Sequence, residues 1–169
     1  LTVVQILWVN IIMDTFAAMA MASLPPNPEV MRDKPRPRDE FIITPAMART
    51  LFTCGAAMVV VLLGMLFRWT ILQGGLTVEQ LTVFFSTFVF LQFWNMFNAK
   101  GFETRHSVFT CLRGCREFFL ILLAIGVGQV LIVEFGGEVF RTVPLTWSEW
   151  AEVIGFTSLL AIGGELIRA

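Results

Sequence analysis

The chain has 169 residues, of which 56% are apolar and only 15% are charged, with a formal net charge of -1 and a mean hydropathy of +0.75. Soluble domains of ordinary composition have about a quarter of their residues charged. The composition therefore excludes an ordinary soluble domain, and it predicts an all-α, polytopic transmembrane helix bundle.

The apolar residues fall into five blocks, and each block predicts one membrane-spanning helix. A span needs about 20 mostly apolar residues. The fifth block is the weakest, because Glu152 and Glu165 leave a short uncharged centre, but Trp147 and Trp150 are typical of a membrane interface. The five predicted spans of this single transmembrane domain, residues 1–169, are residues 2–22, 46–70, 80–99, 117–135 and 147–167.

Positive charge is concentrated in two of the segments between the predicted spans. The loops at residues 23–45 and 100–116 are basic, whereas Arg68 and Arg141 are the basic residues of the other two connections. Cytoplasmic loops carry an excess of Lys and Arg. We therefore expect the loops 23–45 and 100–116 to be cytoplasmic and the first helix to end on the cytoplasmic side.

Small residues and one amide interrupt the fourth and fifth predicted spans. Gly126, Gly128, Gly163 and Gly164 are positions where neighbouring helices can approach closely, and Gln129 is a lone amide in an apolar run. We expect the glycines to lie at helix contacts and Gln129 to form a packing hydrogen bond.

The first predicted span contains two polar residues, Asn10 and Asp14, in otherwise apolar surroundings. A carboxylate near the bilayer centre costs about 2.5–3.5 kcal/mol on insertion scales. Four residues apart on a helix, the two side chains share a face and lie about 6 Å apart along the axis. A hard cation such as Ca²⁺ takes 6–8 oxygen ligands, of which this pair supplies at most about three. The pair predicts one wall of a cation site, and its other ligands must come from other helices.

Two other interpretations of Asn10 and Asp14 remain open at this point. An intramembrane carboxylate also occurs in proton relays. Alternatively, the two side chains only hold helices together through hydrogen bonds, which is common for intramembrane amides.

Longer motifs resemble a known family. The stretches "LWVNIIMDT" and "LPPNPEVMRDKPR" closely resemble the sixth membrane helix and the following loop of P-type cation-transporting ATPases of the calcium-pump class. "FVFLQFWNMFNAK" resembles the eighth helix and "FGGEVFRTVPLTWSEW" the last external loop, so the likeness covers essentially the whole chain. The nearest branch is the plasma-membrane calcium ATPase. The resemblance implies that the five spans are helices six to ten of such a pump.

The resemblance implies that Asn10 and Asp14 are Ca²⁺ ligands. Two further ligand positions of the two-ion pumps, a threonine and a glutamate, are occupied here by Met13 and Gln92. Because a hydroxyl and a carboxylate are thereby lost, we expect one ion per cycle. Gln92 and Asn95 are weaker ligand candidates; together with Asn98 they lie roughly on one side of the third span, where hydrogen bonds between helices are the alternative.

The chemistry of such a pump is ATP-driven and depends on a D-K-T-G motif, which this chain lacks. We therefore assign no catalytic residue and no resident cofactor to the chain. ATP and Mg²⁺ belong to the full-length enzyme, and Ca²⁺ is the transported ion. In the family the proline-rich loop touches the phosphorylated domain, so residues 25–40 are expected to help couple ATP chemistry to ion release, a plain connector being the alternative.

The expected partners are the missing N-terminal part of the same polypeptide and the lipid bilayer of a plasma or bacterial inner membrane; no nucleic acid is expected. Two alternatives to Ca²⁺ export are open. One is the same pump scaffold carrying Mn²⁺ or Na⁺, because oxygen ligands separate hard cations poorly. The other is a non-catalytic membrane scaffold.

Overall fold

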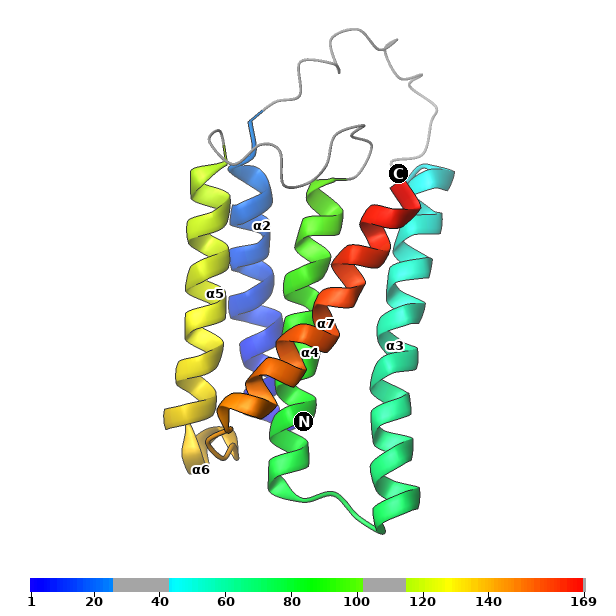
Figure 1. Ribbon diagram of the computed structural model, residues 1–169. Coiled ribbons are helices and arrows are strands. Elements are labelled where there is room, and N and C mark those ends of the chain that lie inside the picture. Colours follow the sequence, from blue (N-terminus) through cyan, green and yellow to red (C-terminus); the bar gives the residue numbers. More distant parts are fainter. Residues whose placement is uncertain (26–42, 102–114, 169) are drawn as a thin grey trace, which may run out of the picture.

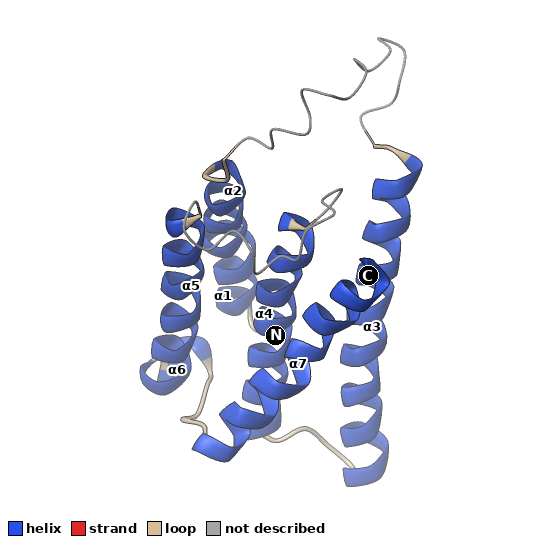
Figure 2. Cartoon of the chain, turned by 45° about the horizontal axis from the view of Figure 1, so that its top comes forward, coloured by secondary structure: helices blue, strands red, loops and turns tan. Residues whose placement is uncertain are grey.

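The computed structural model describes residues 1–25, 43–101 and 115–168, and within these residues every regular element is a helix (Figures 1 and 2). The all-α fold class is thereby confirmed. The elements in chain order are α1 (Val3–Leu7), the π-helix η1 (Trp8–Met13), α2 (Asp14–Ala22), α3 (Pro45–Gln73), α4 (Val78–Lys100), α5 (Arg116–Phe135), α6 (Gly137–Phe140) and α7 (Trp147–Arg168).

Threonine residues cap the starts of α3 and α4, and a glycine ends α3. Thr44 accepts a hydrogen bond from the backbone N–H of Met47 and caps α3, whose first residue is Pro45. Thr77 caps α4 in a reciprocal arrangement with Gln80. Gly74, with φ 73°, ends α3 in the left-handed conformation that glycine adopts without strain. These local signals explain where α3 and α4 begin and where α3 ends.

Three of the helical runs in the described part of the chain are long and apolar enough to cross a membrane. They are Val3–Ala22, Met47–Ile71 and Arg116–Phe135, with mean hydropathies of 1.7, 2.3 and 2.4. The helices α4 and α7 contain more polar residues and do not reach this standard. Their crossing of the bilayer stays a prediction, as does the five-span count.

The long helices alternate in direction along the chain (Figure 1). The predicted loops 23–45 and 100–116 lie mostly outside the described residues, but the helix ends that flank them share one end of the bundle: Ala22, Pro45, Lys100 and Arg116. The N-terminus, α6 and the connection between α3 and α4 lie at the opposite end (Figure 1). This arrangement agrees with both basic loops lying on one side of the membrane.

Helix α4 lies at the centre and packs against α2, α3, α5 and α7 (Figure 2). The main core cluster joins Phe85 and Val89 of α4 to Phe118 of α5 and to Val9 and Met13 of the first helical run. The rings of Phe97 and Phe118 meet edge to face, with centroids 6.0 Å apart. In contrast, the apolar stretch of α3 is essentially uncovered in this chain.

Hydrogen bonds from polar side chains join α4 to α7. The indole N–H of Trp94 donates to Thr157 Oγ1 over 3.1 Å, and Asn98 Nδ2 donates to the carbonyl oxygen of Leu160 over 3.2 Å. A Cβ atom added to Gly164 would clash with the side-chain amide of Asn98, so a glycine at this position permits the contact. For Asn98 and Gly164, the predicted roles in helix–helix contact are confirmed. A Cβ on Gly163 would meet no described atom within 4 Å, so this glycine does not lie at a contact between the described helices.

A second set of hydrogen bonds joins α5 to the start of α7. Glu134 Oε1 accepts hydrogen bonds from the indole N–H of Trp150 over 3.0 Å and from the backbone N–H of Leu145 over 3.3 Å. Trp150 is only 7% exposed and lies in the core, whereas Trp147 is 91% exposed. Both tryptophans were expected at the membrane interface, but only Trp147 has the exposed side chain that this location requires. Trp150 is buried because Glu134 provides an acceptor for its indole N–H inside the bundle.

We expect Glu134→Ala to lower the free energy of unfolding by about 2–4 kcal/mol, because two buried N–H donors lose a charged acceptor. Thermal unfolding of the full-length protein in detergent measures the change. Glu138→Ala, which removes an exposed carboxylate on α6, is the control and leaves the transition unchanged. Equal melting of Glu134→Ala and the unaltered protein would contradict this role.

Candidate cation-binding site

The first helical run is not a uniform α-helix. The π-helix η1 spans Trp8–Met13 and includes Asn10, while Asp14 is the first residue of α2. The backbone N–H of Asp14 donates to the carbonyl oxygens of Val9 and Ile11. It thus bypasses the carbonyl oxygen of Asn10, which is its acceptor in a regular α-helix. Single π turns inside α-helices occur frequently at functional sites.

This geometry changes the expected relation between the two candidate ligands. In an α-helix a residue four positions further along is rotated past its predecessor by part of a turn. A π turn contains more residues, so the same spacing brings Asp14 closer to a line with Asn10 along the helix axis. The prediction assumed an unbroken α-helix and was wrong on that point.

Asn10 and Asp14 are both exposed in this chain. The residues of the same run that face the other helices are Gln5, Val9, Met13 and Ala20, all of them buried. Met13 packs in the core. The two candidate ligands therefore lie on a face that the described helices leave open, and other material has to cover this face in the membrane.

Three contacts position this run against the rest of the bundle. Gln5 Nε2 donates to the carbonyl oxygen of Phe140 over 2.7 Å, which ties the start of α1 to the end of α6. The indole N–H of Trp8 donates to Gln129 Oε1 over 3.2 Å. A Cβ atom on Gly128 would lie 3.3 Å from the Trp8 ring, so the backbone of α5 approaches this ring closely. The predictions for Gln129 and Gly128 are confirmed. The sequence did not predict the contacts of Gln5 and Trp8, although an amide in an apolar run is itself a signal of a helix contact.

The weaker ligand candidates lie on α4 and are half-buried. Asn95 lines a cavity of about 500 Å³ between α3 and α4, together with Thr50 and Cys54. No hydrogen bond within the described residues joins Asn95 or Gln92 to Asn10 or Asp14. Asn95 therefore faces α3 rather than the first helical run.

No group of three or more His, Cys, Asp or Glu side chains with the spacing of a metal site occurs in residues 1–25, 43–101 and 115–168. Asp14 is the single carboxylate of its run. The first helical run thus offers one carboxylate and one amide, which supply fewer oxygens than a hard cation requires.

The sequence matches the family described as "Cation transporting ATPase, C-terminus" over residues 1–169. The chain therefore belongs to the cation-transporting ATPases and represents their C-terminal membrane region, as its motifs predicted.

Among its relatives is calcium-transporting ATPase 5, plasma membrane-type, of Oryza sativa subsp. japonica, which is 39% identical over 99% of this chain and 16% of the relative. Calcium-transporting ATPase 8, plasma membrane-type, of Arabidopsis thaliana is 36% identical over 99% of the chain and 16% of the relative. The plasma membrane calcium-transporting ATPase mca-1 of Caenorhabditis elegans is 32% identical over 99% of the chain and 14% of the relative. The chain thus spans about one-sixth of the length of these relatives.

We expect Gly128→Ala to be less stable than Gly126→Ala by about 1–3 kcal/mol, because a methyl group at position 128 overpacks the Trp8 contact. A Cβ on Gly126 meets Phe93 at an ordinary 3.9 Å, and both variants gain the same helix propensity. Thermal unfolding of the two full-length variants in detergent measures the difference. Equal stability of the pair would show that the close approach of α5 to Trp8 has no energetic weight.

Proposed function

We propose that the chain is the C-terminal membrane part of an ATP-driven Ca²⁺ export pump and supplies part of a single intramembrane Ca²⁺ site. Asp14 is the charged ligand and Asn10 the neutral one. The observation that carries the proposal is the position of Asp14, a carboxylate in an apolar run at the end of a π turn and on the face left open by the described helices. The relatives named above, which are calcium-transporting ATPases, support Ca²⁺ as the ion.

The open face explains how an incomplete ligand set becomes a site. A carboxylate and an amide supply at most about three of the 6–8 oxygens that Ca²⁺ takes. The remaining oxygens come from the part of the polypeptide that precedes this chain, which covers the Asn10 and Asp14 face in the full-length pump. The same part carries the ATP and Mg²⁺ chemistry, and the complete pump resides in a plasma or bacterial inner membrane with the loops 23–45 and 100–116 in the cytoplasm.

The π turn gives this run a way to respond to the ion. A regular α-helix uses every carbonyl oxygen in its ladder, whereas η1 redirects the Asp14 N–H away from Asn10. A small change in the backbone between the π and α ladders alters the relative placement of the two ligand side chains. We infer that such a change accompanies the alternation between inward and outward access.

The charge of Asp14 is the first property to test. In the full-length protein, Asp14→Asn keeps the shape of the side chain and removes its charge, so Ca²⁺-dependent phosphorylation by ATP is expected to fall by at least about a hundredfold, because a hard cation loses its charged ligand. Steady-state phosphorylation at graded Ca²⁺ concentrations measures the effect, with Glu138→Gln as the matched control.

Two outcomes would point to the alternatives. Unchanged Ca²⁺ activation of Asp14→Asn would favour a scaffold in which the side chain only joins helices. Activation of the unaltered protein by Mn²⁺ or Na⁺ but not by Ca²⁺ would keep the pump and change its ion. Size-exclusion chromatography of each variant verifies that the protein is folded.

The number of ions is tested separately. With Gln92 and Met13 at two positions where two-ion pumps have oxygen ligands, we expect one Ca²⁺ per ATP hydrolysed, and Gln92→Ala retains transport within about twofold, since an amide removed outside the site costs little. Parallel measurement of ⁴⁵Ca²⁺ uptake and phosphate release in proteoliposomes gives both values. A ratio of two, or loss of transport in Gln92→Ala, would establish a second site that includes α4.

A further inference from the structure

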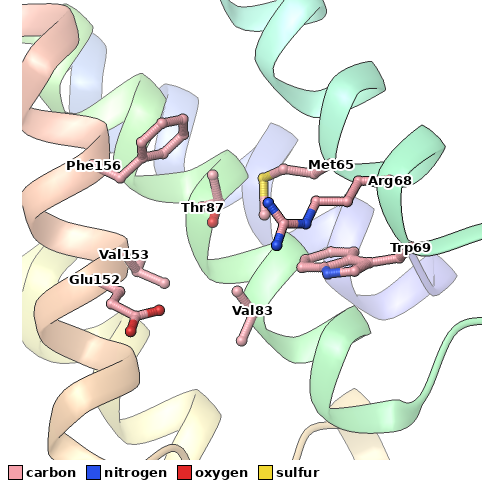
Figure 3. Close-up of a pocket in the computed structure, with 8 residues that line it drawn as sticks. All are labelled: Met65, Arg68, Trp69, Val83, Thr87, Glu152, Val153 and Phe156. Atoms are coloured by element: carbon pink, nitrogen blue, oxygen red, sulfur yellow. The ribbon is translucent and has the colours of Figure 1, made fainter. Parts of the chain in front are cut away.

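A crevice between α3, α4 and α7 brings charges of opposite sign face to face. Its volume is about 470 Å³, within the range of small-molecule sites. Figure 3 shows the guanidinium group of Arg68 and the carboxylate of Glu152 pointing into it from opposite walls, Arg68 from α3 and Glu152 from α7. No ion pair between described residues neutralises either charge within the chain.

The wall contributed by α4 adds a polar group that lacks a partner. The side chain of Thr87 is 1% exposed and lies on the α4 wall of the crevice, between Arg68 and Glu152 (Figure 3). Other helical threonines of the described residues, Thr82 and Thr157 among them, donate to the carbonyl four residues earlier. The hydroxyl of Thr87 makes no hydrogen bond within the described part of the chain. The Thr87 hydroxyl is thus a donor on the crevice wall that a ligand oxygen can accept from.

The depth of the crevice indicates what its ligand is. Arg68 lies three residues before the end of the apolar run Met47–Ile71, which is about 4.5 Å inside that end at the rise of an α-helix. Glu152 lies one and a half turns after Trp147, whose exposed ring is typical of the membrane interface. Trp69 adds a second indole at the same level (Figure 3). The charged walls thus lie where the headgroups of one leaflet meet the hydrocarbon.

The remaining lining is apolar: Met65, Val83, Val153 and Phe156. Beyond the crevice, exposed aliphatic side chains continue along both helices, with Leu63 on α3 and Leu159 on α7. A ligand with a charged end and long apolar chains therefore finds matching surface over its whole length. One positive and one negative wall together match a zwitterion and not an anion.

We propose that this crevice binds a zwitterionic phospholipid with a primary ammonium group, of the phosphatidylethanolamine class, from the leaflet opposite the two basic loops. Arg68 binds the phosphate through a bidentate pair of charge-assisted hydrogen bonds. Glu152 accepts hydrogen bonds from the ammonium group, and Thr87 donates to a phosphate or ester oxygen. The lipid joins α3, whose apolar stretch is uncovered in this chain, to α4 and α7. This inference does not depend on which ion the pump carries.

The test uses the full-length protein in nanodiscs that contain equal amounts of phosphatidylethanolamine, phosphatidylcholine and phosphatidylglycerol. The protein is released from the nanodiscs, and native mass spectrometry then counts the lipid molecules that remain bound to it. We expect the unaltered protein to retain phosphatidylethanolamine, and Arg68→Gln to lower its retention about tenfold, which corresponds to one lost charge-assisted bond. We expect Glu152→Gln to abolish the preference for phosphatidylethanolamine over phosphatidylcholine.

Arg141→Gln and Glu138→Gln are the matched controls, because both remove an exposed charge at the same end of the bundle but outside the crevice. Equal retention in Arg68→Gln and Arg141→Gln would overturn the proposal. Equal retention of phosphatidylglycerol by the unaltered protein would overturn the zwitterionic specificity.

Three further outcomes would overturn it by identifying another occupant. If no lipid is retained, a helix from the rest of the polypeptide fills the crevice. If a membrane protein is retained in its place and is lost in Arg68→Gln, the crevice is a docking site for a partner helix. If the exchange Arg68→Glu with Glu152→Arg restores the melting temperature that each single change lowers, without any bound lipid, the two residues pair directly.

Discussion

Polar groups within hydrocarbon must find their partners inside the protein, and this constraint governs how the chain folds. Apolar surface alone drives helix association weakly in lipid, because lipid tails are as apolar as leucine. In this chain the bonds from Trp8 to Gln129 and from Trp94 to Thr157 join helices that are far apart in the sequence, and the bond from Trp150 to Glu134 joins the successive long helices α7 and α5. Each bond sets the register of one helix pair around α4, and the aromatic and aliphatic core then packs in that register.

Asp14 and Asn10 are exceptions to this constraint, which is why they are informative. The polar residues of the first helical run that face the bundle form hydrogen bonds, as Gln5 does with the carbonyl oxygen of Phe140. Asp14 instead lies on the open face, directly after the π turn. A charged group that the described helices do not satisfy needs a counterpart from outside them, and for Asp14 we propose that this counterpart is the transported ion.

Arg68 and Glu152 form a second exception of the same kind at a different depth. Asp14 lies in a helix that is anchored to α5 through Trp8 and Gln129, whereas Arg68 belongs to α3, which contributes little to the core. The two places thus differ in chemistry: the first offers a carboxylate and an amide on one helical run, and the second offers opposite charges on two helices.

The sequence by itself determined the class of protein, the limits of the long helices and the candidate ligands. Length of apolar blocks, threonine caps and the glycine at position 74 are local properties, so they need no knowledge of the fold, and the motifs around Asn10 and Asp14 are specific to the family. Tertiary structure decided the rest. The π turn is defined by which carbonyl each N–H reaches in the folded chain, and the buried Trp150 donates to Glu134, a residue of another helix. The facing of Arg68 and Glu152 likewise arises only when α3 and α7 pack beside α4, because hydropathy along a chain carries no information about which faces meet.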